Sequence, residues 1–208
     1  MRKNLLKNML LALFLTAAVP TMNAQIAHVG DILCEGDLIV SPANFNANTH
    51  TAKAVVFYVD NTGQHGWAIA LQDAGRTTWG YNGFDTPIPN FTTARQAIYG
   101  LDGYENTRIV RQCGTNFHVF NLVDFDNGWY VPAIGQLNYL YGNIREVNAS
   151  LEMVGAVKFI EDSGWDYWSS TEYSGFYAWV LKPSGELVYY YFDSGSSGYH
   201  GVRAAINF

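Results

Sequence analysis

The last third of the chain alternates short aromatic segments with tight turns. Residues 166–173 (DYWSSTEY), 176–181 (FYAWVL) and 186–192 (ELVYYYF) are rich in the aromatic and β-branched residues that favour strands. They are separated by SG and by KPSGE, and the second of these contains the Pro, Ser and Gly that favour a tight hairpin turn. The pattern predicts an antiparallel sheet that ends in a last strand, GVRAAINF (201–208).

The middle of the chain carries helical patterns. FTTARQAIYG (91–100) predicts a short helix capped by Thr92 or Thr93 and stopped by Gly100. In LDGYENTRIVRQCG (101–114), Asp102 and Gly103 indicate a turn, and Asn106 or Thr107 a further cap. The clearest helix follows Pro132, because apolar residues recur at helical spacing as far as Val147. AVKFI (156–160) is either a strand or the end of a second short helix.

An early β-hairpin completes the expected architecture. AVVFYVD (54–60) and WAIAL (67–71) flank the turn NTGQHG, whereas SPANFNANTHTAK (41–53) is typical of a loop. Charged residues make up 14% of the chain, aromatic residues make up 15%, and there are 20 glycines, which suits sheet with long structured loops. We therefore expect a C-terminal antiparallel sheet that the early strands are able to join, and two main helices, in an α+β fold.

The first 24 residues have the pattern of a secretory signal. Arg2, Lys3 and Lys7 precede an apolar run at 10–18, and MNA before Gln25 is a plausible cleavage site. The run is too short to span a bilayer, so we expect no membrane span and export to the periplasm, the cell surface or the medium. The expected organisation is a signal peptide at 1–24, an N-terminal extension at 25–53 and one domain at 54–208.

The net charge argues against one class of partner, and the two cysteines leave two possible states. Removing three basic residues with the signal takes the formal charge from -6 to about -9, and an acidic chain without a basic stripe argues against nucleic acid as a partner. Cys34 and Cys113 either form one disulfide or remain two buried thiols.

No catalytic, metal-binding or cofactor motif stands out. The five histidines, at 28, 50, 65, 118 and 200, show no ligand-like pairing. DFDNG (124–128) lacks the full spacing of a calcium loop and is better interpreted as a polar turn. Glu161, Asp162, Asp166 and Glu172 have the pattern of solvated loop acids. We therefore predict no enzyme activity and no cofactor.

The chemistry that the sequence does offer lies near its end, where tyrosines stand beside serines and glycines. Tyrosine supplies stiff contact area, and Ser and Gly supply adaptable hydrogen bonding, the mixture that antibody loops use. The alternative is a two-sided strand with alternate rings in the core, followed by an ordinary loop. The candidate ligand-binding residues are Phe176, Tyr177, Tyr189, Tyr190, Tyr191, Phe192, Asp193, Ser194, Ser196, Ser197, Tyr199 and His200.

Several separated motifs resemble one known family. GWYVPAIGQLNYLYGNI (128–144), YWSSTEYSGFYAWVL (167–181), YHGVRAAINF (199–208) and DGYENT (102–107) are similar, in this order, to the C-terminal lectin-like domain of exported proteins of gut Bacteroidetes. This domain is also described as formylglycine-generating-enzyme-like or of the Legionella collagen-like protein C-terminal type. The resemblance spans roughly 54–208 and implies a C-type-lectin fold. It implies scaffold roles for Trp129, Trp168, Trp179 and Arg203.

Some members of this family are variable proteins of diversity-generating retroelements. In these, randomised adenines turn asparagine codons into many others, and all thirteen residues from Tyr189 to Gly201 belong to the set that such codons can yield. The chain departs from the family at Ala133, Gln136 and Ile206, and IPN (88–90) lacks the carboxylate of the sugar-binding EPN triplet. The resemblance implies an exported adhesin or receptor whose ligand is a protein or a glycan. An envelope assembly component that forms oligomers is the alternative, and an enzyme on the same fold is a more distant one.

Overall fold

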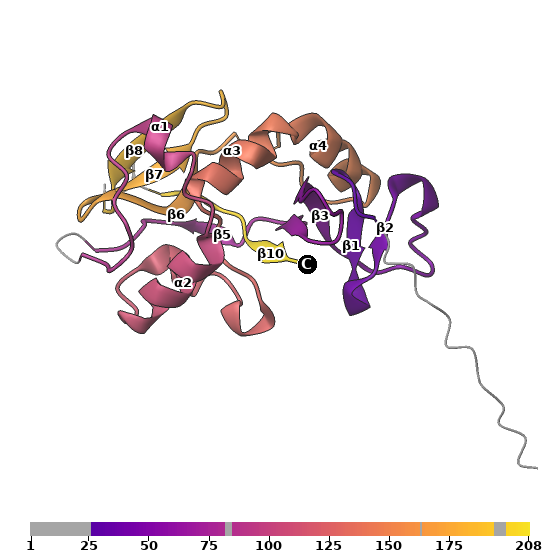
Figure 1. The fold of residues 1–208 in the computed structure, drawn as a ribbon, viewed down its shortest axis with the longest axis horizontal. Helices are drawn as coiled ribbons and strands as arrows, with labels where there is room; N and C mark the ends of the chain where they lie inside the picture. The colour runs from indigo at the N-terminus through magenta and orange to yellow at the C-terminus, as the bar shows by residue number, and fades with distance from the viewer. Residues whose placement is uncertain (1–25, 82–84, 163, 194–198) are drawn as a thin grey trace, which may run out of the picture.

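The structure is a computed structural model that describes residues 26–81, 85–162, 164–193 and 199–208. It is a mixed α+β fold built on two five-stranded sheets, with helices packed on them (Figure 1). The expected signal peptide at 1–24 lies outside the described residues.

The first sheet contains the early hairpin, as predicted. Its strands are β1 (Ile32–Cys34), β2 (Ile39–Val40), β3 (Ala52–Val59), β4 (Gly66–Ala70) and β10 (Ala205–Asn207), in the order β10-β4-β3-β1-β2. All neighbours are antiparallel, and Val55 of β3 pairs with Ile69 of β4. Because β1 and β2 extend this sheet from within 25–53, the expected boundary at residue 54 does not separate an extension from the sheet.

The second sheet contains the three predicted C-terminal strands. Its members are β5 (Gly75–Thr77), β6 (Tyr167–Ser174), β7 (Tyr177–Leu181), β8 (Leu187–Tyr191) and β9 (His200–Val202), in the order β5-β9-β6-β7-β8. β6 and β9 are parallel, and the other neighbours are antiparallel. The predicted β7–β8 turn is present, with Gly185 at a φ of 84° that favours glycine.

The expectation of a single last strand over 201–208 was wrong. The segment divides into β9 in the second sheet and β10 in the first, with Arg203 and Ala204 between them. The last residues of the chain therefore contribute one strand to each sheet. The fold has two sheets where one was expected.

The helices agree with the sequence patterns in part. α1 (Ala94–Ala97) is capped by Thr93, one of the two caps that the sequence allowed, and Thr93 accepts from the Gln96 N–H at 3.3 Å. α2 (Gly103–Gln112) begins earlier than predicted, because Asp102 is itself the cap and accepts from the Glu105 N–H at 2.9 Å. Asn106 and Thr107 therefore lie inside this helix.

The long helical pattern after Pro132 forms two helices. These are α3 (Ile134–Gly142) and α4 (Ile144–Met153), and Asn143 interrupts them with non-helical backbone angles. Residues 156–160 form neither the strand nor the helix end that the sequence left open. Short 3-10 turns occur at Glu35–Asp37, Pro42–Asn44, His118–Asn121 and Phe125–Asn127. Within the described ranges, no helix is long and apolar enough to cross a membrane.

The helices cover the sheets from different sides. α3 contacts β3, β6 and β7 and so bridges the two sheets, while α4 contacts β3 and α2 contacts β6 (Figure 1). One core lies beneath α3 and α4 and includes Leu137 and Leu140. A second core around Trp79 and Phe120 packs against the other face of the second sheet and includes Trp168.

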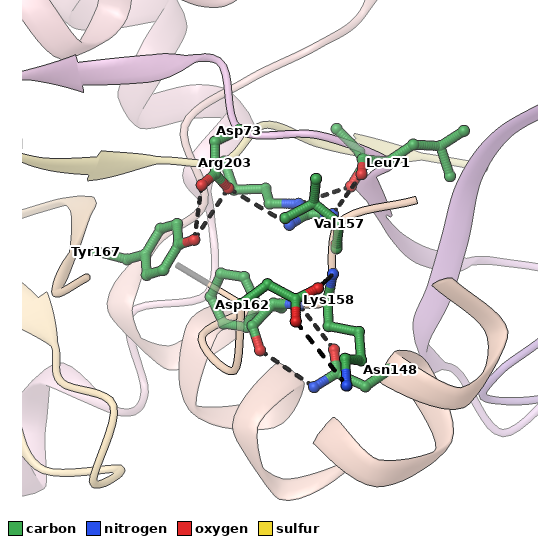
Figure 2. Close-up of polar contacts among 10 residues, drawn as sticks. Leu71, Asp73, Asn148, Val157, Lys158, Asp162, Tyr167 and Arg203 are labelled. Atoms are coloured by element: carbon green, nitrogen blue, oxygen red, sulfur yellow. Dashed lines mark hydrogen bonds and ion pairs between the residues drawn. The ribbon is translucent and has the colours of Figure 1, made fainter. Parts of the chain in front are cut away.

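Arg203 joins the two sheets through a buried guanidinium group. Its Nε donates to Ala70 O at 2.8 Å, and its Nη2 donates to Leu71 O at 2.7 Å and to Val157 O at 2.6 Å (Figure 2). Its Nη1 lies 3.4 Å from Asp73 Oδ1, and the Tyr167 hydroxyl donates to the same carboxylate. Burial lowers the pKa of Arg203, and the nearby Asp73 opposes this shift.

The segment that receives Arg203 is fixed in turn by α4. Asn148 Nδ2 donates to Phe159 O at 3.1 Å, and the Phe159 N–H donates to Asn148 Oδ1 at 2.8 Å (Figure 2). The guanidinium therefore connects the first sheet, the second sheet and α4.

The two cysteines do not form a disulfide. Cys34 is buried in β1, whereas Cys113 is exposed after α2. Of the two possibilities left open by the sequence, free thiols are the one found, although only Cys34 is buried.

Replacing Arg203 is expected to destabilise the fold strongly. Arg203→Met removes the guanidinium donor to three carbonyls and the positive charge beside Asp73, and Arg203→Lys keeps the charge but loses the planar fork. Because breaking a buried charged network costs about 3–5 kcal/mol, we expect a decrease of that size in the free energy of unfolding for Arg203→Met. Urea denaturation followed by tryptophan fluorescence measures it.

Arg95→Met is the matched control, since Arg95 is exposed on α1 and should change stability by no more than about 0.5 kcal/mol. Equal stability of the Arg203 and Arg95 variants would contradict the role assigned to Arg203.

Candidate functional site

The edge strand β8 has two different faces. Tyr189 and Tyr191 are exposed, at 44% and 47% of their surface, while Val188 and Tyr190 on the other face are half-buried. This alternation follows from the two-residue period of a strand. One face of β8 is thus an exposed aromatic surface, and the other packs toward the core as the two-sided-strand alternative predicts.

Exposure rises along the face that carries Tyr189 and Tyr191. The cross-strand pairs are Leu181 with Leu187, Trp179 with Tyr189, and Tyr177 with Tyr191. Leu181 and Trp179 are buried, whereas Tyr177 is half-buried. α3 contacts β7, and the ring of its Tyr141 lies against Gly185 in the β7–β8 turn. The helix therefore covers the end of this face near the β7–β8 turn and leaves the end near Tyr177 and Tyr191 open.

The open end carries a group of rings that we call the tyrosine patch. Its members are Tyr173, Phe176, Tyr177, Tyr189 and Tyr191. Tyr173 stacks on Tyr189 with ring centroids 3.9 Å apart, and Tyr177 packs on Tyr191 at 4.1 Å. Tyr177 also meets Tyr189 edge to face at 5.7 Å. The rings are therefore preorganised by contact with one another.

Two phenol groups of the patch, those of Tyr173 and Tyr177, have raised pKa values. A hydrogen bond with Tyr191 is the main cause that raises the pKa of Tyr177 to about 12. A hydrogen bond with Tyr189 likewise raises the pKa of Tyr173. Tyr173 and Tyr177 therefore keep their protons at physiological pH and present uncharged hydroxyl groups beside their aromatic faces.

Phe192 was wrongly included among the ligand-binding residues. It is fully buried and stacks on Trp79 with centroids 4.2 Å apart, because it continues the inward face of β8. A side chain without exposed surface cannot contact a partner. It belongs to the second core.

Tyr190 and His200 also point away from the tyrosine patch. Their rings stack at 4.8 Å, and the Tyr190 hydroxyl donates to Asp166 Oδ2 at 3.3 Å. His200 packs against Trp168 as well, and burial lowers its pKa. These two half-buried residues support the sheet from its inner face.

The remaining candidates lie elsewhere or outside the described residues. Asp193 and Tyr199 are exposed, and the Tyr199 carbonyl accepts from Arg76 Nη2 at 2.6 Å beside Trp165. Tyr199 precedes β9, and β6 and β7 separate β9 from β8 in the sheet. Ser194, Ser196 and Ser197 lie outside the described residues.

The expected scaffold residues occupy interior positions. Trp168 and Trp179 are buried, and their indole N–H groups donate to Thr77 O at 2.9 Å and to Phe91 O at 2.7 Å. Trp129 is half-buried against the core of the first sheet.

Glu172 differs from the loop acid that the sequence suggested. It lies in β6 with no exposed surface, and Oε1 accepts from the Thr86 hydroxyl at 2.8 Å. Among the described residues, Oε2 has no hydrogen-bond partner. Burial is the main cause that raises its pKa to about 8, and Asp85 adds to the shift. Its position inside a predicted strand was the available signal that it is not a loop residue.

The described surface also contains open clefts. One of them, of about 660 Å³, is lined by Glu35, Lys53, Asp124, Asn127 and Trp129 among others. Lys53 pairs with Asp37 at 3.5 Å, and Asp124 accepts from Asn127 at 2.7 Å, so several of its polar groups already have partners. No cluster of three or more His, Cys, Asp or Glu side chains suited to a metal ion occurs within the described parts of the chain.

A known protein of low sequence identity has a fold similar to that of this chain. No family model and no curated protein matches the chain. Among solved structures, the chain is similar to a fimbrial protein from Bacteroides ovatus, with a TM-score of 0.64 and 18% sequence identity. The match covers 87% of this chain and 49% of that one, so the chain spans about half the length of the fimbrial protein. The two chains share a fold.

The buried Glu172 is expected to make stability depend on pH. Its pKa is about 8 when folded and 4.5 in its ordinary state, so over this interval the folded protein holds a proton that the unfolded chain has lost. The free energy of unfolding should therefore fall as pH rises from about 5 to about 8 and then level off. Urea denaturation across this range measures the slope.

The glutamine side chain of Glu172→Gln cannot ionise, so in this variant the free energy of unfolding should lose the part of its pH dependence that comes from Glu172. Glu152→Gln removes an exposed carboxylate from α4 and should keep it. A Glu172→Gln protein with the wild-type pH profile would show that the carboxyl group is ionised in the fold.

Proposed function

We propose that this protein is an exported, non-enzymatic ligand-binding protein of the adhesin or receptor type, and that the tyrosine patch contacts its ligand. The observation that carries the proposal is the paired packing of Tyr173 on Tyr189 and of Tyr177 on Tyr191 at the open end of the second sheet. The ligand is a protein or a glycan.

The patch has the physical properties of a binding surface. Tyrosines are enriched at binding hot spots because each presents a large amphipathic ring. Here the rings already pack on one another, so binding immobilises few free side chains and costs less conformational entropy. Phe176, 50% exposed in the β6–β7 turn, extends the apolar area beside the hydroxyl groups.

The C-type-lectin type of fold is part of this proposal. The order of the lectin-like motifs supports it, and so does the placement of their tryptophans and Arg203 in the interior. The name of the structurally similar fimbrial protein supports a role at the cell surface.

Diversification by a retroelement is proposed for exposed positions alone. Tyr189, Tyr191, Asp193 and Tyr199 are exposed, so substitutions at these positions should change stability little. Phe192 lies in the same permitted run, but its truncation to alanine would cost about 3–5 kcal/mol in a packed core. A productive template must therefore preserve an apolar residue there.

Assembly into a larger structure is a second candidate. β8 is the edge strand of its sheet, and an edge presents unpaired backbone groups to which another chain can add a strand. In that case the tyrosine patch would pack on a neighbouring subunit.

Removing two rings of the patch is expected to abolish ligand capture. The double variant Tyr189→Ala/Tyr191→Ala should bind at least about tenfold more weakly, because hot-spot truncation costs about 2 kcal/mol or more. Wild type is screened on arrays of defined glycans and extracellular protein domains, and the strongest binder is measured by surface plasmon resonance. Tyr81→Ala, at another exposed tyrosine, is the control and should leave affinity unchanged.

Unchanged binding in the double variant would place the ligand elsewhere. If no arrayed ligand binds, and wild type instead forms concentration-dependent oligomers that the double variant lacks, the patch serves assembly.

The DNA beside the gene is expected to contain a reverse-transcriptase gene and a near-copy of the final codons that differs at adenines. We expect the differences at the codons of exposed residues such as Tyr189 and Tyr191, and an unchanged apolar codon at Phe192. Sequencing the locus checks this, and a locus without either feature leaves an undiversified lectin-like protein.

A further inference from the structure

A second exposed aromatic surface lies beside the C-terminal strand. A cleft of about 450 Å³ opens there, a volume within the usual range for small-ligand sites. A smaller cleft shares Trp67 and Asn207 with it. The residues that line the larger cleft are Trp67, Tyr99, Leu101, Asp102, Tyr104, Gln136 and Asn207.

Three aromatic rings from separate segments line this cleft. Trp67 of β4 is half-buried and stacks on Tyr58 at 4.2 Å. Tyr104 of α2 stacks on Phe125 at 5.0 Å and is 39% exposed. Tyr99, after α1, is 75% exposed. Trp67 and Tyr104 each pack on another ring outside the cleft, and the rest of their surface is available to a ligand.

Asp102 gives the cleft a negative charge. It is the one charged side chain among the described lining residues. Oδ1 caps α2 by accepting from the Glu105 N–H at 2.9 Å, and no partner for Oδ2 occurs within the described chain. The Gly103 N–H at the same helix end donates to Gln136 Oε1, so the helix presents its capping carboxylate rather than unsatisfied N–H groups.

A buried relay of hydrogen bonds orients Asn207. Gln136 Oε1 accepts from the Gly103 and Ala133 N–H groups, so its Nε2 is the atom that donates to the Tyr130 hydroxyl, at 3.0 Å. That hydroxyl in turn donates to Asn207 Oδ1 at 2.8 Å. Burial raises the pKa of Tyr130, so the hydroxyl keeps its proton. The amide Nδ2 of Asn207 remains available as a donor in the cleft.

We propose that this cleft binds an organic ammonium group that has an oxygen atom a few bonds away, as in choline. The faces of Trp and Tyr rings carry negative potential and attract such cations, and Asp102 adds a full negative charge. Asn207 Nδ2 would donate to the ligand oxygen. The acidic charge of the chain, about -9 without residues 1–24, favours the approach of a cation.

The cation can be tested against a ligand of the same shape without charge. Choline and its neutral isostere 3,3-dimethylbutan-1-ol are titrated into the wild-type protein, and the Trp67 indole and Asn207 amide signals are followed by ¹⁵N NMR. We expect choline to shift both signals and to bind at least tenfold more tightly than the neutral alcohol. Added salt should weaken choline binding, since screening reduces the attraction of Asp102.

Substitutions distinguish the contribution of the Asp102 charge to choline binding from that of the aromatic rings. Asp102→Asn keeps a capping oxygen for α2 and should weaken choline binding at least fivefold. Tyr99→Ala should weaken it severalfold, whereas Tyr99→Phe retains the ring face and should bind as wild type does. Asn207→Asp still accepts from Tyr130 and adds a charge, so tetramethylammonium, which has no oxygen, should bind it more tightly than wild type.

Equal binding of choline and the neutral alcohol, wild-type affinity in Asp102→Asn, or signal changes with methyl glucoside but not with choline would each overturn the proposal. Tyr189→Ala/Tyr191→Ala should leave choline binding unchanged. Loss of choline binding in that variant would assign the ligand to the tyrosine patch instead of this cleft.

Discussion

The buried guanidinium of Arg203 is the interaction on which the arrangement of the two sheets depends. It lies between the last two strands, which belong to different sheets, and donates to carbonyls from β4, from the segment after it, and from the segment after α4. A buried charge is tolerated only where its hydrogen bonds are satisfied and a counter-charge is near. Those requirements bring together parts of the chain that are more than a hundred residues apart.

This connection has consequences for the surfaces. With β9 and β10 tied to different sheets, α3 packs across both and covers one end of the β7–β8 face. Leu181 and Trp179 are buried under that cover, and Tyr177 emerges beyond it. The tyrosine patch is therefore the uncovered continuation of the core, and its rings pack on one another beside the buried residues of the same strands.

The two candidate surfaces suit different ligands. The tyrosine patch contains no acidic or basic side chain, and hydrogen bonds link Tyr173 to Tyr189 and Tyr177 to Tyr191. The cleft at Trp67 contains the Asp102 carboxylate, whose Oδ2 has no hydrogen-bond partner among the described residues. The first has the properties of a contact surface for a large partner, and the second those of a site for a small cation. Glu172 belongs to neither, because its environment favours an uncharged carboxyl group inside the sheet.

Patterns within a few residues determined the local elements. The hairpin of β3 and β4, the strands β6 to β8, the turn at Gly185 and the Thr93 cap follow from alternation, turn residues and capping chemistry, and all were predicted. Only the tertiary structure decided that 201–208 divides between two sheets, that Glu172 is buried, and that Phe192 faces the core while Tyr191 faces solvent. Alternation along β8 says that neighbouring rings face opposite ways, but which face is buried depends on Trp79 and α3, which are distant in sequence. Long-range pairing and covering set burial, and burial decides which of these tyrosines can meet a ligand.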